Sequence, residues 1–302
     1  MKTSTSYYNS WINNVMRWKM LLNQLNFNFL KLILVILFVQ INPAVGKEKL
    51  NLTYDNIEVF LEGNFVQGGL VIGKSDPKIE IKFKNKLLRK NSDGYFIIGF
   101  GRDHPDIAHL SLKPKKVWLE KPISIKKRIY KTQIINGLQK KMVTPPKSFY
   151  DRIIKENKSI KYIRGIDSNI DFIFQKFNWP VKGIVSGVFG SQRILNGIPK
   201  RPHYGVDIAA PKGSPVLAPI KSIVRMAEKD LYYTGGTIML DHGHGVTSVY
   251  SHLSAINVKV GDTVSRGQKI GEVGSTGRST GPHLDWRVNW FYERLDPALL
   301  VD

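Results

Sequence analysis

Short apolar runs separated by Gly, Pro, Asn and Asp dominate the first half of the chain, and this rhythm favours strands over helices. The stretch "KIEIKF" at residues 78–83 alternates strictly between charged and apolar side chains, which is the pattern of a half-exposed strand. The runs "IEVFL", "GGLVIG", "YFIIGF", "AHLSL" and "KVWLE" share this short spacing. We therefore predict a small β-sandwich-like domain over residues 47–143.

Two further regions follow that domain. Pro145 and Pro146 interrupt the strand pattern, and "KSFYDRIIKENKSIKYIRGI" then places apolar residues at helical spacing. These features predict a short helical linker over residues 144–180. Residues 181–302 become rich in Gly and strand-like again and contain five of the seven histidines. We expect a mainly β protein whose C-terminal part is a second, compact β domain.

The N-terminal stretch has the layout of a secretory signal. Lys31 precedes an eight-residue apolar run over residues 32–39, and small residues follow at the peptidase-type positions Ala44 and Gly46. The run is shorter than the ~20 residues that span a bilayer. We predict a signal peptide over residues 1–46, with translation starting at Met16 or Met20, and export to the periplasm or cell envelope without a stable membrane span. An uncleaved membrane anchor is the alternative.

The absence of cysteine and the high positive charge limit the kinds of site and of binding partner that this chain can have. The chain has no cysteine, which excludes disulfides, a cysteine nucleophile and a thiolate metal site. Its formal net charge is +21, and residues 47–150 alone hold 21 basic and 10 acidic side chains. In an exported protein this excess predicts an anionic envelope partner, such as cell-wall polymer or lipid headgroups, and not nucleic acid. A lysine-rich solvated surface without a specific partner is the alternative.

Three clusters in the C-terminal half supply nitrogen and carboxylate ligands. His203 and Asp207 stand four residues apart, His252 ends an apolar run, and His283 and Asp285 flank one leucine. Alternation along a strand puts His283 and Asp285 on one face. Zinc accepts such ligands, and catalytic zinc sites use three protein ligands plus water. His104 and His109, in the N-terminal half, are expected to have surface roles.

Residues 185–298 resemble the lysostaphin/LytM-type zinc metallopeptidases, a family of peptidoglycan endopeptidases. The resemblance is carried by "GVFGSQR", "HYGVDIAAPKGSPVLAP", "DHGHGVTSVYSHLS", "VKVGDTVSRGQKIGEVGSTGRSTGPHL" and "LDPALL". It implies a compact antiparallel β domain with a groove and one Zn²⁺ ion at the groove floor. By the same resemblance His203 and Asp207 are zinc ligands, and His252 and His283 are catalytic.

One position departs from the family pattern. The third zinc ligand of the family is the second histidine of a His-x-His pair, and here that position holds Asp285. Aspartate binds zinc, but two carboxylates formally neutralise the dication and favour other divalent ions more than histidine does. We predict a zinc-dependent endopeptidase acting on peptidoglycan, with His203, Asp207 and Asp285 as metal ligands. A catalytically silent wall-binding module that regulates another cell-wall hydrolase is the alternative.

Overall fold

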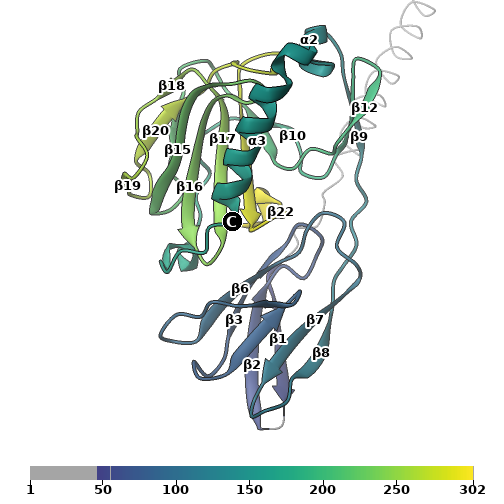
Figure 1. Cartoon of the computed structure of the whole chain (residues 1–302), viewed down its shortest axis with the longest axis vertical. Helices are drawn as coiled ribbons and strands as arrows, with labels where there is room; N and C mark the ends of the chain where they lie inside the picture. The colour runs from purple at the N-terminus through teal and green to yellow at the C-terminus, as the bar shows by residue number, and fades with distance from the viewer. Residues whose placement is uncertain (1–45, 55, 302) are drawn as a thin grey trace, which may run out of the picture. The chain divides into compact units, whose positions relative to one another are not determined.

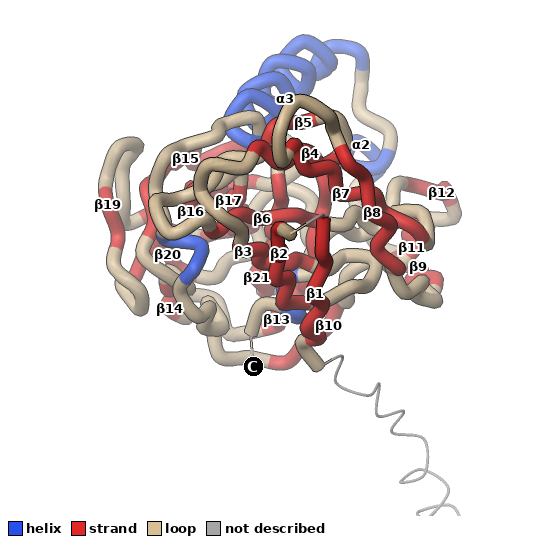
Figure 2. Tube along the Cα trace, turned by 90° about the horizontal axis from the view of Figure 1, so that it is seen from below, coloured by secondary structure: helices blue, strands red, loops and turns tan. Residues whose placement is uncertain are grey.

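Strands are the main regular element of the structure, and the longest helix, α3 (Tyr150–Arg164), lies at one side of it (Figure 2). The computed structural model describes residues 46–54 and 56–301. The predicted signal peptide lies outside these residues, apart from Gly46. Among the described residues no helix is both long enough and apolar enough to cross a membrane.

Two antiparallel four-stranded sheets form the N-terminal region (Figure 1). Along β2 and β7 the buried and exposed side chains alternate, as the sequence pattern predicted, and the buried ones from both sheets join one hydrophobic core. The first sheet has the order β1 (Glu48–Tyr54), β2 (Ile57–Gly63), β3 (Leu70–Lys74) and β6 (Tyr95–Gly99); the second has the order β5 (Lys86–Leu87), β4 (Glu80–Phe83), β7 (Ile107–Lys113) and β8 (Leu119–Ser124).

The two N-terminal histidines differ in environment. His109 is exposed and lies 3.6 Å from Glu120, as expected for a surface residue. His104 is buried, stacks on Phe83 and contacts the edge of Phe100, so its predicted surface role is wrong. Its Nδ1 lies 2.8 Å from the carbonyl oxygen of Pro105. Burial lowers the pKa of His104, which keeps its ring neutral in the aromatic core.

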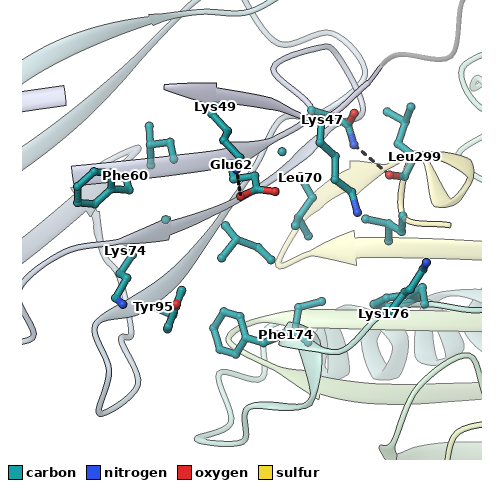
Figure 3. A pocket seen from close by; sticks show the side chains of 18 of the residues that line it. Lys47, Lys49, Phe60, Glu62, Leu70, Lys74, Tyr95, Phe174, Lys176 and Leu299 are labelled. Carbon is teal, nitrogen blue, oxygen red and sulfur yellow. Dashed lines mark hydrogen bonds and ion pairs between the residues drawn. The ribbon is translucent and has the colours of Figure 1, made fainter. Parts of the chain in front are cut away.

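A hollow of about 570 Å³ lies beside the first N-terminal sheet (Figure 3). Strand residues such as Phe60 and Tyr95 face residues 173–177 across it. Its lining includes four lysines: Lys47, Lys49, Lys74 and Lys176. Lys49 lies 3.8 Å from Glu62, and Lys74 lies over the ring of Tyr95. Three of the 21 basic side chains of residues 47–150, together with Lys176, therefore line this partly aromatic surface.

The segment between the two β regions is helical, as predicted. It contains α2 (Lys140–Val143), α3 (Tyr150–Arg164) and the 3-10 helices Lys147–Phe149 and Phe172–Phe174. α3 lies against the sheet that contains β15 and β17 (Figure 1), with Ile163 packed on Met226, Met239 and Val249.

An eight-stranded antiparallel sheet forms the centre of the C-terminal region. β16 and β17 are buried along their whole length, because this sheet is covered on both faces. The order is β10 (Ile184–Gly187), β13 (Val206–Ala209), β21 (His283–Trp290), β17 (Val246–Leu253), β16 (Gly235–Gly243), β15 (Ser222–Leu231) and β19 (Thr263–Val264), and β22 (Glu293–Leu295) pairs with β21. The 3-10 helix Pro297–Leu299 follows β22.

Two three-stranded sheets flank this central sheet. One joins β14 (Pro215–Leu217), β20 (Lys269–Glu272) and β18 (Ala255–Ile256). The other joins β12 (Ile198–Lys200), β11 (Gln192–Leu195) and β9 (Thr132–Ile135). β9 belongs by sequence to the predicted N-terminal domain, yet it pairs with β11 in parallel.

Residues 46–302 form a single compact unit. Phe83 of β4 contacts Trp290 of β21, and Arg128 pairs with Asp296 at 2.7 Å. The N-terminal and C-terminal cores are therefore continuous. The domain boundaries at residues 143 and 180 stay predictions.

Candidate metal centre and groove

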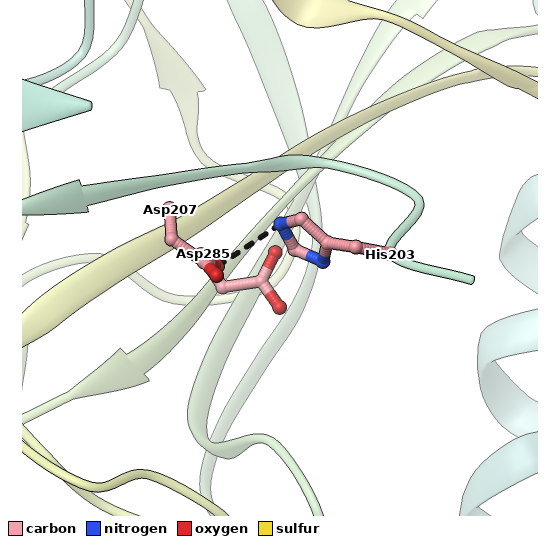
Figure 4. A group of neighbouring side chains, drawn as sticks. All are labelled: His203, Asp207 and Asp285. Atoms are coloured by element: carbon pink, nitrogen blue, oxygen red, sulfur yellow. Dashed lines mark ion pairs between the residues drawn. The ribbon is translucent and has the colours of Figure 1, made fainter. Parts of the chain in front are cut away.

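The three predicted metal ligands lie together. Asp207 of β13 and Asp285 of β21 are directly opposite each other in an antiparallel pair, so their side chains share one face of the sheet. His203 precedes β13, and hydrogen bonds join its backbone to residues 190 and 191. Figure 4 shows the imidazole facing both carboxylates. All three residues are buried, and one ligand atom from each lies within 4.8 Å of the others.

Unpaired polar atoms indicate that this cluster fits a cation. His203 Nε2 lies 3.1 Å from Asp207 Oδ1, yet neither atom has a hydrogen-bond partner, and His203 Nδ1 has none either. Buried polar atoms are normally satisfied, so such a group requires an explanation. A bare imidazole nitrogen and a carboxylate oxygen repel each other at this distance unless a proton or a metal ion lies between them. The donor set of one imidazole and two carboxylates suits a divalent ion.

Each of the two carboxylates accepts hydrogen bonds from an arginine, and the sequence analysis did not predict either arginine. Arg193 of β11 donates from Nη2 to Asp207 Oδ2 at 2.5 Å. Arg287 donates from Nε to Asp285 Oδ1 at 2.9 Å and from Nη2 to Oδ2. Burial opposes ionisation of Asp285, but the charge and hydrogen bonds of Arg287 outweigh burial and hold the pKa of this carboxyl well below its usual value.

The Asp285–Arg287 pair changes the charge of the site. Taken alone, two carboxylates neutralise a dication, as the sequence suggested. The guanidinium of Arg287 cancels one of these charges and leaves Asp285 as part of a neutral pair. Gly205 makes room for this arrangement, since a Cβ at that position would lie 2.5 Å from Arg287 Cγ and 3.0 Å from Asp285 Oδ1. Residues 285 and 287 lie on one face of β21, and this i, i+2 spacing was the signal in the sequence.

The two predicted catalytic histidines lie side by side, with ring centroids 4.8 Å apart. His252 Nδ1–H donates to the carbonyl oxygen of Thr276 at 2.7 Å, and His283 Nδ1–H donates to that of Gly281 at 2.8 Å. With Nδ1–H donating in this way, the neutral form of either ring has Nε2 as an acceptor. His283 Nε2 lies 3.9 Å from Asp207 Oδ1, which places this pair beside the metal cluster.

His252 has two further properties typical of a functional residue. Burial lowers its pKa to about 4, so the ring is neutral near pH 7 and can accept a proton. Its backbone has φ of +66°, a left-handed conformation that non-glycine residues seldom adopt. The backbone N–H of His252 donates to Thr234 O at 2.8 Å, which holds the residue in this conformation.

The remaining histidines of this region have other partners. His242 is buried between the hydroxyl groups of Ser222 and Ser248, at 2.9 and 2.7 Å. His244 Nε2 lies 2.8 Å from Asp171 Oδ1. Neither belongs to the metal cluster found among the described residues.

A groove of about 310 Å³ opens onto this cluster. Asp207, His252 and residues 278–283 are among the residues that line it. Three residues from the β9 region also line it: Gln133, Ile135 and Leu138. Sequence reasoning did not find these three, because only the long-range pairing of β9 with β11 brings them to the groove.

Residues 201–297 match the family model described as peptidase family M23. This stretch contains the whole His203–Asp207–Asp285 cluster and both neighbouring histidines. Over residues 201–297, called the M23 domain, the chain is similar to that family. The M23 fold is also found in a crystal structure of a peptidase M23 from Pseudomonas aeruginosa, with a TM-score of 0.58 and 26% identity. That match covers 78% of this chain and 94% of the other, so it includes more than the M23 domain.

Two curated relatives resemble the M23 domain closely. Peptidoglycan DD-endopeptidase ShyA of Vibrio cholerae is 41% identical over 117 residues, which are 38% of this chain and 27% of ShyA. DD-carboxypeptidase/endopeptidase Mpg of Neisseria meningitidis serogroup B is 45% identical over 91 residues, which are 30% of this chain and 21% of Mpg. The matches thus span only about a quarter of each relative.

Proposed function

We propose that this chain is an exported, zinc-dependent endopeptidase that hydrolyses peptide cross-links of peptidoglycan. The observation that carries the proposal is the buried cluster of His203, Asp207 and Asp285, in which His203 and Asp207 have unpaired ligand atoms and Asp207 lines the groove. Two histidines with an Nε2 acceptor lie beside it. The likeness of the M23 domain to two peptidoglycan peptidases supports the substrate. The basic N-terminal region would hold the chain on this anionic polymer.

The chain's own residues suit amide hydrolysis. His203, Asp207 and Asp285 would hold the zinc ion, which supplies Lewis acidity and lowers the pKa of water. His252 accepts a proton at Nε2, because its Nδ1–H is committed to Thr276 O and burial keeps the ring neutral. His283, oriented in the same way by Gly281 O, can take up a proton at Nε2 and would then, as Nε2–H, donate a hydrogen bond to the negative charge that develops on the scissile group. The groove walls orient the peptide.

A digest of purified cell walls tests this function. We expect the full chain with added zinc to release soluble muropeptides whose cross-links are cut, and mass spectrometry of the products identifies the bond. EDTA stops release and zinc restores it. Failure of the zinc-loaded chain to release any fragment would contradict the proposal.

The pairing of Asp285 with Arg287 favours a second candidate, a silent M23 module that binds the wall and regulates another hydrolase. In that case the guanidinium replaces the metal charge near Asp285. The wild-type chain would then bind the wall without cutting it.

Arg287→Gln separates the two candidates. If the chain binds metal, removal of a cation near a dication strengthens zinc binding about tenfold by Coulomb attraction, whereas turnover falls because the bound metal becomes less positive. Titration calorimetry measures the affinity, and Lys259→Gln, at an exposed position, is the control.

Zinc binding by Arg287→Gln but not by the wild type would identify Arg287 as a replacement for the metal and favour the silent module. Asp285→His alone leaves Arg287 without its carboxylate, so restoring a family-like site requires both substitutions.

A further inference from the structure

Arg278 presents a guanidinium group to the groove without a carboxylate partner. It lines the groove beside Ser279 and Thr280. No ion pair joins it to an acidic side chain in the part of the chain that the structure describes; its Nη1 donates only to Met142 O, at 3.4 Å. Burial lowers the pKa of Arg278, and the neighbouring charges of Arg287 and Arg193 lower it further. A half-buried cation in this setting is stabilised by an incoming anion.

The structure holds Arg278 in place before any ligand arrives. Its guanidinium lies over the ring of Tyr233, 4.7 Å from the centroid, and its backbone N–H donates to Tyr233 O at 2.8 Å. The preceding Gly277 has φ of +68°, and a Cβ there would lie 2.5 Å from Gly235 N. Only glycine allows so close an approach of this loop to residues 233–235. The cation is therefore preorganised, which lowers the entropic cost of binding.

The facing wall holds an unpaired acceptor and an unpaired donor. Gln133 of β9 is paired in register with Arg193 of β11, and both line the groove. Gln133 Oε1 and Arg193 Nε are buried and have no hydrogen-bond partner. Arg193 Nη2 is already committed to Asp207. A peptide amide offers both complements, an N–H for Gln133 and a C=O for Arg193.

We propose that the groove selects peptides that carry a free carboxylate, with Arg278 binding the carboxylate and the Gln133–Arg193 pair binding one backbone amide. This inference rests on the proposed function for the peptide nature of the substrate. It makes Arg278 the residue that determines charge specificity and Gln133 the residue that binds the backbone.

Binding to the EDTA-treated full chain tests the inference without turnover. The probes are a purified cross-linked muropeptide with free carboxylates and the same muropeptide after carbodiimide amidation of those carboxylates. Titration calorimetry should show that amidation weakens binding to the wild type about tenfold, the loss expected for a charge-assisted hydrogen bond. Arg278→Gln should bind both probes equally weakly, and Arg278→Lys should recover part of the preference.

Two further variants complete the design. Gln133→Leu should weaken the binding of both probes about fivefold. It should keep the preference for the carboxylate form, because the substitution removes only a contact to a backbone amide. Arg266→Gln, at an exposed turn, should behave as the wild type. The thermal unfolding midpoint of each variant reports whether the fold is intact. Equal binding of both probes by the wild type, no binding of either, or an unchanged preference in Arg278→Gln would overturn the inference. Carboxylate-selective binding without wall hydrolysis would contradict the proposed endopeptidase activity but support the proposed role of Arg278 in peptide recognition.

Discussion

Substituting His203 by alanine will remove bound zinc and reduce cell-wall hydrolysis to the level of buffer alone. His203 supplies the only imidazole of the ligand cluster, and the two remaining carboxylates are each held by an arginine. Two arginine-paired carboxylates retain a divalent ion poorly, because each guanidinium repels it. Elemental analysis of the purified variant measures the loss directly, beside turbidity clearing of purified walls.

The fold of the His203→Ala variant should survive. Arg193 and Arg287 keep Asp207 and Asp285 neutralised, so no buried charge is left unpaired. His109→Ala is the matched control, since His109 is an exposed histidine in the N-terminal region. A His203→Ala protein that keeps a full complement of zinc would show that the metal binds elsewhere.

Substitution of His252 or His283 by alanine will have a different signature. We expect turnover to fall about 10²–10⁴-fold, the range for loss of a positioned acid or base, while about one zinc ion stays bound. Neither residue belongs to the ligand cluster, and each ring is oriented by a backbone carbonyl. Steady-state rates on a defined muropeptide, together with elemental analysis, separate this effect from metal loss.

The double variant adds a second criterion. Because the two rings lie 4.8 Å apart and act on the same groups, their effects should be less than additive. Unchanged hydrolysis in either single variant would exclude the catalytic role proposed for that histidine. Wall clearing by neither the wild type nor His283→Ala would favour the regulatory module.

Much of the fold followed from local patterns. The alternation in "KIEIKF" and the Gly- and Pro-bounded runs predicted the N-terminal strands, and apolar spacing predicted α3. The surface role expected for His104 was wrong. A histidine followed by Pro-Asp is typical of a surface turn, but here His104 packs against the aromatic rings of Phe83 and Phe100. The parallel pairing of β9 with β11 leaves no local trace, since it joins segments that are far apart in the chain.

The histidines and aspartates of the candidate site could be predicted from the sequence, because these residue types are common metal ligands. The structure places the five predicted residues together, because β13, β17 and β21 are neighbours in one sheet. The arginines were missed because arginine in a basic protein usually faces solvent. Arg287 at i+2 from Asp285 was visible as a same-face pair, but Arg193, Arg278 and Gln133 reach the groove only through tertiary structure.

Because β9 pairs with β11, the groove is built from two stretches that lie far apart in the sequence. The proposed metal ligands and catalytic histidines come from residues 203–285, whereas part of the groove wall comes from residues 133–138. A fragment cut to the boundaries of the M23 match would keep every reactive group and lose that wall. Under the proposed function, the reactive groups and this part of the peptide-contacting wall are thus encoded in separate stretches, so residues 133–138 can change while those groups are kept.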